Sequence, residues 1–465
     1  MIRNAPLWPV MAVTIALLAV FDPLLARLVP SGILAMTGLT RAPVQFLPLL
    51  LLGAGALFLL RRGLARTGGF TAQSLILLLA AAQLNGFAVG PLDLFDLAVF
   101  SIFGIWLATR ALDTRRPIYL PPAILLGGLL IALSVAHLPV GSPVRWFIGT
   151  FGITRAALVA FLITDLCRDR AALTMFIRAL LAVAAVSAAI GIVQFTLAYS
   201  GIYYFTFIDP PLSAFKPTPL GFVMRASGLC ITAQHYSSFL VLAFPFALWR
   251  LSDNWRLRDF ALVALLAGGI LVSWNFGALF AAMLIGAALP FLRYPGHIVH
   301  ILLGAALVAS LGYFTGLLQL VYDISFGDAG VAKGIDQRHT LFQLGIEKIA
   351  DNPLIGTGPQ QFASGDGNFW HRPVHNAFGQ AGAELGILAT LILVAMFFYL
   401  ATELGRLCMY KPARAMAAPA LLALFAFLQL TQSEPNLDQA NTWLMFGFAQ
   451  AIALVLWREL RGQSN

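Results

Sequence analysis

Apolar runs of about 20 residues recur along almost the whole chain, and short polar or basic turns separate them. A run of that length can cross the hydrocarbon core of a bilayer as a helix. The pattern therefore predicts an all-α, polytopic membrane protein with about 12–14 transmembrane helices. The expected spans are 8–28, 42–60, 70–89, 94–112, 118–137, 147–166, 174–199, 235–250, 259–273, 277–292, 298–319, 376–400, 415–431 and 442–457.

Two longer polar intervals, at 201–234 and 320–375, interrupt this pattern. The first is rich in proline, which cannot continue a helix, so we expect a shaped loop there. The second is long enough to carry short helices of its own. The expected organisation is N-terminal transmembrane helices in 1–200, a core that holds both loops in 201–400, and C-terminal transmembrane helices in 401–465.

The second loop contains the signals of a short helix followed by a glycine turn. Asp336 is a suitable N-cap for a helix over 338–350, and Asn352-Pro353 should end that helix. The backbone amides of the following turn, Gly356-Thr357-Gly358, could approach an anion.

The next helix is expected to start near Asn376. Gly379, Gly382 and Gly386 then form a smooth face for close helix contact. Glu384 lies about two turns into this helix, in the outer part of the membrane, where an ionisable group is a candidate site residue. We expect Glu384 to orient a nearby histidine.

Composition and charge placement agree with a membrane protein. The chain is 60% hydrophobic and 11% charged, whereas a soluble domain is roughly 45–50% apolar and about 25% charged. The net charge of +9 does not indicate a nucleic-acid partner, because the basic residues cluster on alternate loops. With the N-terminus inside, the cytoplasmic ends carry Arg3, Arg61, Arg62, Arg66, Arg110, Arg115, Arg116, Arg168, Arg170, Arg250, Arg256, Arg258, Arg293, Arg406, Lys411, Arg414, Arg458 and Arg461.

The opposite short loops hold only Arg27, Arg41 and Arg145. This asymmetry predicts that both termini face the cytoplasm and that both long loops face outward. No small-residue cleavage site follows the first apolar run, so we expect a first helix rather than a removed signal peptide. Three cysteines are too few for a disulfide framework, and Cys230 has no obvious partner.

Two features of the first half have competing interpretations. Asp93 and Asp96 could hold a divalent metal, but a role in capping the next helix is favoured. Arg155 lies well inside the sixth predicted span, where a charge costs about 2.5–3.5 kcal/mol. It must therefore face other protein, water or a bound anion, and a structural partner is the favoured interpretation.

Further candidates lie on the outer side of the core. Arg225 precedes an Ala-Ser-Gly turn just before a span, where a guanidinium can reach a phosphate at the headgroup level. Ser273-Trp274-Asn275 forms either a tight outer turn or a helix interruption that lines a cavity. Together with the long loop, the outer face gathers Arg225, Arg338, His339, His371, Arg372, His375 and Glu384.

This cluster allows three interpretations. A zinc site at His371 and His375 is disfavoured, because Arg372-Pro373 works against the helix that their spacing needs. A structural interpretation has His375-Asn376 cap the next helix while Arg338 pairs with a carboxylate. A chemical interpretation has two arginines hold a departing diphosphate, while a histidine accepts a proton from a sugar hydroxyl.

The long-loop motifs carry a resemblance to a known family. The segment Arg338–Phe362 contains Asn-Pro-Leu-Ile-Gly-Thr-Gly, and His375-Asn376 is followed after nine residues by Gly386. Over about 225–390 the chain resembles the O-antigen ligase and O-antigen polymerase superfamily. The resemblance implies a GT-C-type glycosyltransferase of the bacterial inner membrane whose long periplasmic loop carries short helices and the active site.

The implied reaction is inverting, needs neither metal nor cofactor, and uses undecaprenyl-diphosphate-linked glycan. By the same resemblance Arg338 binds the diphosphate, His375 activates the acceptor, and Arg225 takes the place of the family's arginine before a span. The expected catalytic residues are His375, Arg338 and Glu384. The expected substrate-binding residues are Arg225, Arg338, Asn376, Arg372, His339 and Trp370.

Two positions depart from the family pattern. Many ligases have Ser-Arg-Gly or Ser-Arg-Ser where this chain has Ser273-Trp274-Asn275, so an arginine expected near the diphosphate is missing. Arg225 and Arg155 are the candidates to replace it. The end of the His-Asn motif also differs, with Ala389-Thr390 in place of a glycine.

The expected reaction is polymerisation of O-antigen or exopolysaccharide repeat units onto a second lipid-linked repeat. Ligation of glycan to lipid A-core is the near alternative, and protein O-glycosylation is a more distant one. Membrane lipid and a chain-length regulator are further candidate partners. The rival from another class is a lipid-linked saccharide transporter, which is disfavoured because no internal repeat is visible and the polar residues cluster on one side.

Overall fold

The structure is a computed structural model that describes most of the chain after residue 68. The described residues are 69–84, 88–89, 92–112, 120–137, 142–199, 215–218, 221–230, 232–297, 329–365, 368–369, 372–431, 437 and 439–462. Three predicted spans, 8–28, 42–60 and 298–319, lie outside the described residues.

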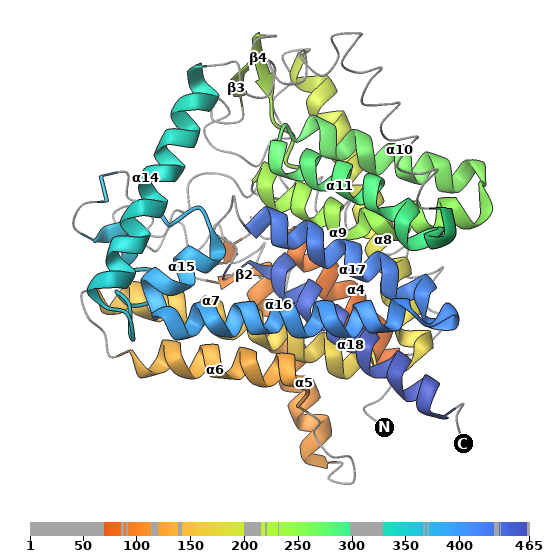
Figure 1. Ribbon diagram of the computed structural model, residues 1–465, viewed down its shortest axis with the longest axis horizontal. Coiled ribbons are helices and arrows are strands. Elements are labelled where there is room, and N and C mark those ends of the chain that lie inside the picture. The colour runs from red at the N-terminus through yellow and green to blue at the C-terminus, as the bar shows by residue number, and fades with distance from the viewer. Residues whose placement is uncertain are drawn as a thin grey trace, which may run out of the picture.

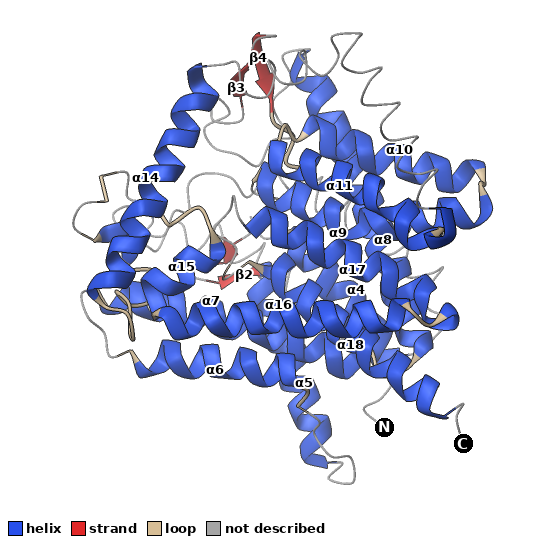
Figure 2. Ribbon diagram, in the orientation of Figure 1, coloured by secondary structure: helices blue, strands red, loops and turns tan. Residues whose placement is uncertain are grey.

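Helices make up nearly all of the described chain (Figure 2). Two small antiparallel pairs accompany them, β1 (Ala88–Val89) with β2 (Leu92–Asp93) and β3 (Phe215–Thr218) with β4 (Gly221–Met224). The helices are α4 (Gly69–Gln83), α5 (Leu94–Leu112), α6 (Pro122–Ala136), α7 (Pro143–Leu166), α8 (Arg170–Tyr199), α9 (Ala233–Asn254), α10 (Leu257–Val272), α11 (Phe276–Arg293), α14 (Ala329–Asp351), α15 (Ala377–Leu385), α16 (Ile387–Cys408), α17 (Lys411–Thr431) and α18 (Ala440–Gly462). The all-α fold class is thereby confirmed.

Six of the described helices are long and apolar enough to cross a membrane: α7, α8, α11, α16, α17 and α18. Shorter apolar helices occur in α4, α5 and α6. These lengths and compositions indicate a membrane protein.

Ten of the predicted spans each correspond to one described helix, and their ends follow local signals. Pro122 and Pro143 begin α6 and α7, where the missing backbone N–H of proline costs nothing. The Thr232 hydroxyl caps α9 by accepting from the backbone N of His235 at 3.2 Å. The prediction of one span over 376–400 is wrong, because α15 and α16 are separate helices.

The bundle core lies among the central helices. α17 packs against α9, α11, α16 and α18, and α18 also packs along α7. Phe448 on α18 meets Phe176 on α8 and Phe246 on α9, with ring centroids 4.3 and 5.6 Å apart. Figure 1 shows α6, α7, α16 and α18 running side by side.

The bundle has two chemically different ends. One end, called the basic end below, contains the turn between α7 and α8, the α9–α10 turn, the α16–α17 turn and the last turn of α18. Ion pairs join its helices there, between Arg170 and Glu459 at 2.8 Å and between Arg250 and Asp259 at 2.8 Å. The other end, called the loop end, carries α14 and α15 in Figure 1.

Candidate functional site

The α14–α15 unit is built on glycines that allow close helix contact. α14 buries Leu341 and Gly345 against the segment that leads into α15. A Cβ added to Gly345 would lie 3.0 Å from Val374, and one added to Gly382 would lie 2.6 Å from Ile349. The predicted smooth face of the second helix therefore exists, and α14 is the helix that packs on it.

α14 differs from its prediction at one end only. It ends at Asp351, directly before Asn352-Pro353, as predicted. It begins at Ala329, so Asp336 lies inside the helix and is not its N-cap. The helix runs through Asp336 because no proline directly precedes that residue. The preference of Asp for a cap position does not by itself interrupt a helix.

The glycine turn after α14 binds the end of α15 and has no free amides for an anion. The backbone N–H groups of Thr357 and Gly358 donate to the carbonyl oxygens of Ala383 and Glu384, each at 2.8 Å. The N–H of Gly356 donates to Asn352 at 2.8 Å. The predicted anion-binding role of these amides is therefore wrong, because the last carbonyls of α15 need donors and take them.

Gly386 separates α15 from α16 and explains the broken span. Its φ is 87°, a left-handed conformation that favours glycine. A Cβ at Gly386 would lie 2.2 Å from the carbonyl oxygen of Leu354. The next N–H, from Ile387, donates to Pro353 at 2.8 Å. The turn at 352–358 and the break at Gly386 thus form one backbone clamp that fixes the direction of α15.

Glu384 contributes to the same clamp. It is 2% exposed, and its Oε2 accepts a hydrogen bond from the backbone N of Gln360 at 3.0 Å. About 12 Å of helix separates it from the N-terminus of α15, where His375 lies. The expectation that Glu384 orients His375 does not fit this separation. Its catalytic role stays a prediction, and the contact described here is structural.

His375 and Asn376 stand at the N-terminus of α15. Asn376 is the N-cap, and its Oδ1 accepts from the backbone N of Gly379 at 2.9 Å. The structural interpretation of His375-Asn376 is confirmed for Asn376. The His375 side chain is half-buried and directly precedes this cap. Its position on the α14–α15 unit is therefore fixed by a helix end rather than by a loop.

Two arginines act on His375. Burial, then the guanidinium of Arg338 on α14, then that of Arg372 lower the pKa of His375 to about 4. In the described part of the chain, neither Arg338 nor Arg372 has an ion pair, so the predicted carboxylate partner of Arg338 is not found there. His375 is consequently neutral at physiological pH beside two exposed positive charges.

Arg372 is held through its backbone by a residue that the sequence did not single out. Asn368, 3% exposed, donates from Nδ2 to the carbonyl oxygens of Arg372 at 2.7 Å and Phe362 at 3.1 Å. An asparagine within a glycine-rich polar loop carries no pattern that distinguishes it from a solvated one. His339 is exposed on α14. Trp370 and His371 lie outside the described residues.

Arg225 lies at a second part of the loop end. Its Nε donates to the carbonyl oxygen of Ser273 at 3.3 Å, and the N–H of Ala226 donates to Val272 at 2.9 Å. Arg225 therefore sits on the α10–α11 turn that contains Trp274. This is the turn at which the family resemblance leads us to expect an arginine.

Gln194 on α8 holds the segment that follows Arg225. Its Nε2 donates to Gly228 at 2.7 Å, and its Oε1 accepts from the N–H groups of Ser227 and Gly228 at 3.2 and 2.9 Å. Gln194 is 1% exposed. Its role was not predicted from the sequence, although a glutamine inside a long apolar run is a signal of such a role.

The turn between α10 and α11 is short and well defined. Asn275 caps α11 by accepting from Gly277 at 3.2 Å, and its Nδ2 donates to the Ser237 hydroxyl at 2.9 Å. Trp274 takes a left-handed conformation with φ of 46°. Of the two predicted alternatives for this segment, the tight turn is confirmed.

Arg155 belongs to a separate cluster, in which its charge is paired with two carboxylates. Its Nη1 lies 2.9 Å from Asp96 and 3.3 Å from Asp93. The two aspartates also cap α5 reciprocally, because each backbone N–H donates to the other's carboxylate, at 2.7 and 2.9 Å. The favoured predictions for all three residues, cap and structural partner, are confirmed. Arg155 is thus not the replacement for the missing arginine.

The described contacts of Asp93 and Asp96 are with each other and with Arg155. Burial raises the pKa of Asp93 to about 6 against the lowering effect of Arg155, and Asp96 raises it further. In the parts of the chain that the structure describes, no group of three metal-ligating residues occurs, and the three cysteines are free and buried.

Comparison with known proteins gives no family. No protein-family profile matches the chain, and no curated protein matches it.

Proposed function

We propose that the protein transfers glycan from an undecaprenyl-diphosphate-linked saccharide to the hydroxyl of an acceptor sugar. The reaction is inverting and uses neither metal nor cofactor. The observation that carries the proposal is the group Arg338, Arg372 and His375 on the α14–α15 unit. The family resemblance of the same segment suggests which chemistry this group performs.

The two guanidiniums supply what a lipid diphosphate needs. The diphosphate gains negative charge as its bond to the sugar breaks, and fixed cations nearby stabilise that charge without a metal. Since no carboxylate pairs with Arg338 or Arg372 among the described residues, both have donors available for phosphate oxygens. Arg225 is the third candidate, because its position on the α10–α11 turn suits a headgroup-level anion.

His375 supplies the base. A neutral imidazole can accept a proton, and His375 is neutral because burial and two positive neighbours lower its pKa. A bound diphosphate would reduce the effect of those positive neighbours and raise the pKa of His375 toward its ordinary value. The base thus becomes stronger when the donor is present, which couples proton acceptance to a filled site.

The expected side of the membrane follows from charge. The basic end holds most of the arginines that terminate the described spans, so by the positive-inside rule it faces the cytoplasm. The loop end, with His375, then faces the periplasm of a bacterial inner membrane, and both termini are cytoplasmic. The donor reaches the site with its lipid in the membrane and its glycan outside.

The test is a reconstituted assay in EDTA with purified protein and undecaprenyl-diphosphate glycan. A second lipid-linked repeat and lipid A-core are offered as separate acceptors. A ladder of longer lipid-linked chains identifies a polymerase, which we expect, and glycan on lipid A-core identifies a ligase. The absence of transfer to both acceptors contradicts the proposal, and movement of lipid between leaflets in that case identifies a transporter.

A further inference from the structure

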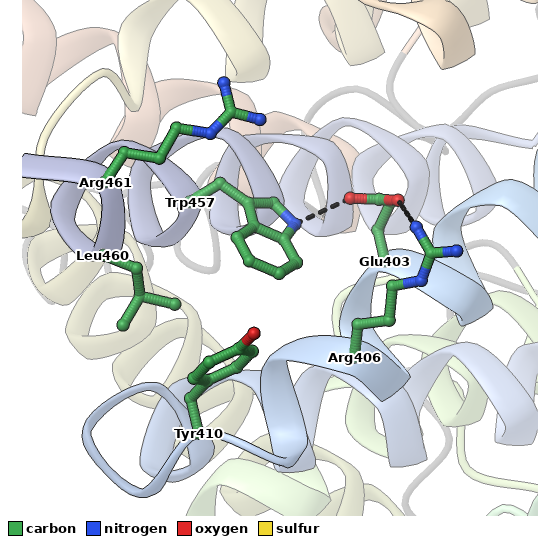
Figure 3. Close-up of a pocket in the computed structure, with 6 residues that line it drawn as sticks. All are labelled: Glu403, Arg406, Tyr410, Trp457, Leu460 and Arg461. Atoms are coloured by element: carbon green, nitrogen blue, oxygen red, sulfur yellow. Dashed lines mark hydrogen bonds and ion pairs between the residues drawn. The ribbon is translucent and has the colours of Figure 1, made fainter. Parts of the chain in front are cut away.

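A pocket of about 460 Å³ lies at the basic end, far along the bundle from His375. Figure 3 shows its lining, which comes from the last turns of α16 and α18 and from the α16–α17 turn: Glu403, Arg406, Tyr410, Trp457, Leu460 and Arg461. Its volume falls within the range of about 300–1,000 Å³ that is usual for small-molecule sites. The proposed glycan transfer makes no use of it.

The pocket has a fixed floor. Trp457 Nε1 donates to Glu403 Oε2 at 2.7 Å, and Arg406 Nη1 lies 3.5 Å from Glu403 Oε1. Tyr410 meets the Trp457 ring edge to face with centroids 5.6 Å apart. Glu403 therefore holds both the aromatic floor and one guanidinium in place, and Tyr410 is 45% exposed at the rim.

The lining carries a surplus of positive charge. The lining includes two guanidiniums, from Arg406 and Arg461, and one carboxylate, from Glu403. Arg406 is 66% exposed and uses one of its five donors on Glu403, so its remaining donors are available to an anion. Lys411 begins the next helix and adds a further positive charge close by.

The location specifies the source of the anion. α16 and α18 are two of the helices that can cross a membrane, and their last turns lie where headgroups would meet water. Tyrosine and tryptophan are enriched at that level, and basic pockets between spans on the cytoplasmic side bind anionic headgroups. Along its length, towards its other end, α16 also exposes Phe398 and Leu391, an apolar surface of the kind that contacts acyl chains.

From these observations we infer that the pocket binds the phosphate headgroup of an anionic phospholipid between the ends of α16 and α18. Arg406 and Arg461 contact the phosphate, and Trp457 and Tyr410 support the glycerol. This inference is independent of the proposed transfer, since the two sites lie at opposite ends of the bundle.

The test is native mass spectrometry of delipidated protein given equal amounts of phosphatidylglycerol and phosphatidylcholine. Arg406→Gln, Arg461→Gln and the double variant are compared with Arg256→Gln, an exposed basic residue on the α9–α10 turn. We expect preferential retention of phosphatidylglycerol, reduced about fivefold by each single change and about 25-fold by the double change. Arg256→Gln should retain wild-type preference.

Three results would each overturn the inference. The first is equal retention of the two lipids by the wild type, and the second is unchanged preference in the double variant. The third is displacement of phosphatidylglycerol by an equal concentration of glycerol 3-phosphate, which would make a soluble phosphate the ligand. Thermal unfolding of each delipidated variant is measured alongside, and Arg461→Lys, which keeps the charge, should retain most of the preference if the variants are folded.

Discussion

Two arginine clusters on this chain differ in whether carboxylates pair with them in the described residues. Arg155 lies between Asp93 and Asp96, and those carboxylates also cap α5. Arg338 and Arg372 have no ion pair among the described residues, and they act instead on His375. The positive charge of Arg155 is thus paired within the fold, whereas we propose that the charges of Arg338 and Arg372 bind a ligand.

This difference suggests a structural role for Arg155 and is consistent with the proposed functional role of Arg338. Arg155 is 17% exposed with a partner at 2.9 Å, so its removal leaves a buried carboxylate unpaired. Arg338 is exposed, so its removal leaves no buried charge behind. Substitutions at the Arg155 cluster should therefore affect stability, and substitutions at the His375 cluster should affect activity.

The largest effect is expected from His375→Gln. Loss of the base should lower kcat by about 10²–10⁴-fold, because that is the usual contribution of general base catalysis. Stability should change little, since His375 is only half-buried. The measurement is steady-state transfer in liposomes with a thermal unfolding scan. His297→Gln at the basic end is the matched control, and equal turnover in both variants would remove His375 from the mechanism.

Next in size is Asp96→Ala, which should lower the free energy of unfolding by about 3–5 kcal/mol because it breaks a buried pair and a cap. Asp351→Ala removes a 63% exposed carboxylate 3.9 Å from Lys348 and should cost less than about 1 kcal/mol. Both are measured by chemical unfolding in detergent. Similar losses from the two variants would show that the Arg155 cluster does not stabilise the fold as described.

A third variant, Gly386→Ala, tests whether the backbone clamp positions His375. The left-handed φ and the contact with Leu354 should cost about 1–3 kcal/mol and should lower kcat as α15 moves. Gly405→Ala on α16 meets no atom within 4 Å and should be neutral or stabilise by up to about 1 kcal/mol. Wild-type turnover in Gly386→Ala would show that the backbone clamp is not needed to position His375.

The smallest effect is a shift between two pH profiles. With a pKa of about 4 in the free protein, His375 stays neutral as pH falls from 7 to about 5, so kcat/KM should hold until below that pH. Bound diphosphate raises the pKa, so the acid limb of kcat should appear at higher pH than that of kcat/KM. If the acid limbs of kcat and kcat/KM fell at the same pH, donor binding would not raise the pKa of His375, contrary to the proposal.

The sequence predicted elements better than it predicted contacts. α5 was predicted over 94–112 and found at Leu94–Leu112, because its apolar run is bounded by clear polar signals. The break at Gly386 was missed because hydropathy is continuous across it, and only a clash with the backbone of Leu354 requires glycine there. Local periodicity does not encode such a tertiary constraint.

The candidate site was predicted only in part, because some of its contacts are also tertiary and are not encoded in local periodicity. The sequence predicted that Arg338, Arg372 and His375 lie on the same side of the membrane. In the structure both arginines are close enough to lower the pKa of His375. The glycine-turn amides were wrongly assigned to an anion, because sequence alone does not show that the end of α15 needs donors. Asn368 and Gln194 were missed because their roles depend on backbone groups distant in sequence.

We propose that Arg338 and Arg372, which have no ion pair among the described residues, form the diphosphate site beside His375. The most direct test is equilibrium binding of undecaprenyl diphosphate, without sugar, to the wild type, to the Arg338→Gln/Arg372→Gln double variant and to Arg256→Gln. We expect the double variant to bind at least about 100-fold more weakly, since each charged hydrogen bond contributes about 1.5–3 kcal/mol. Arg256→Gln should bind with wild-type affinity. Wild-type affinity in the double variant would contradict the proposal.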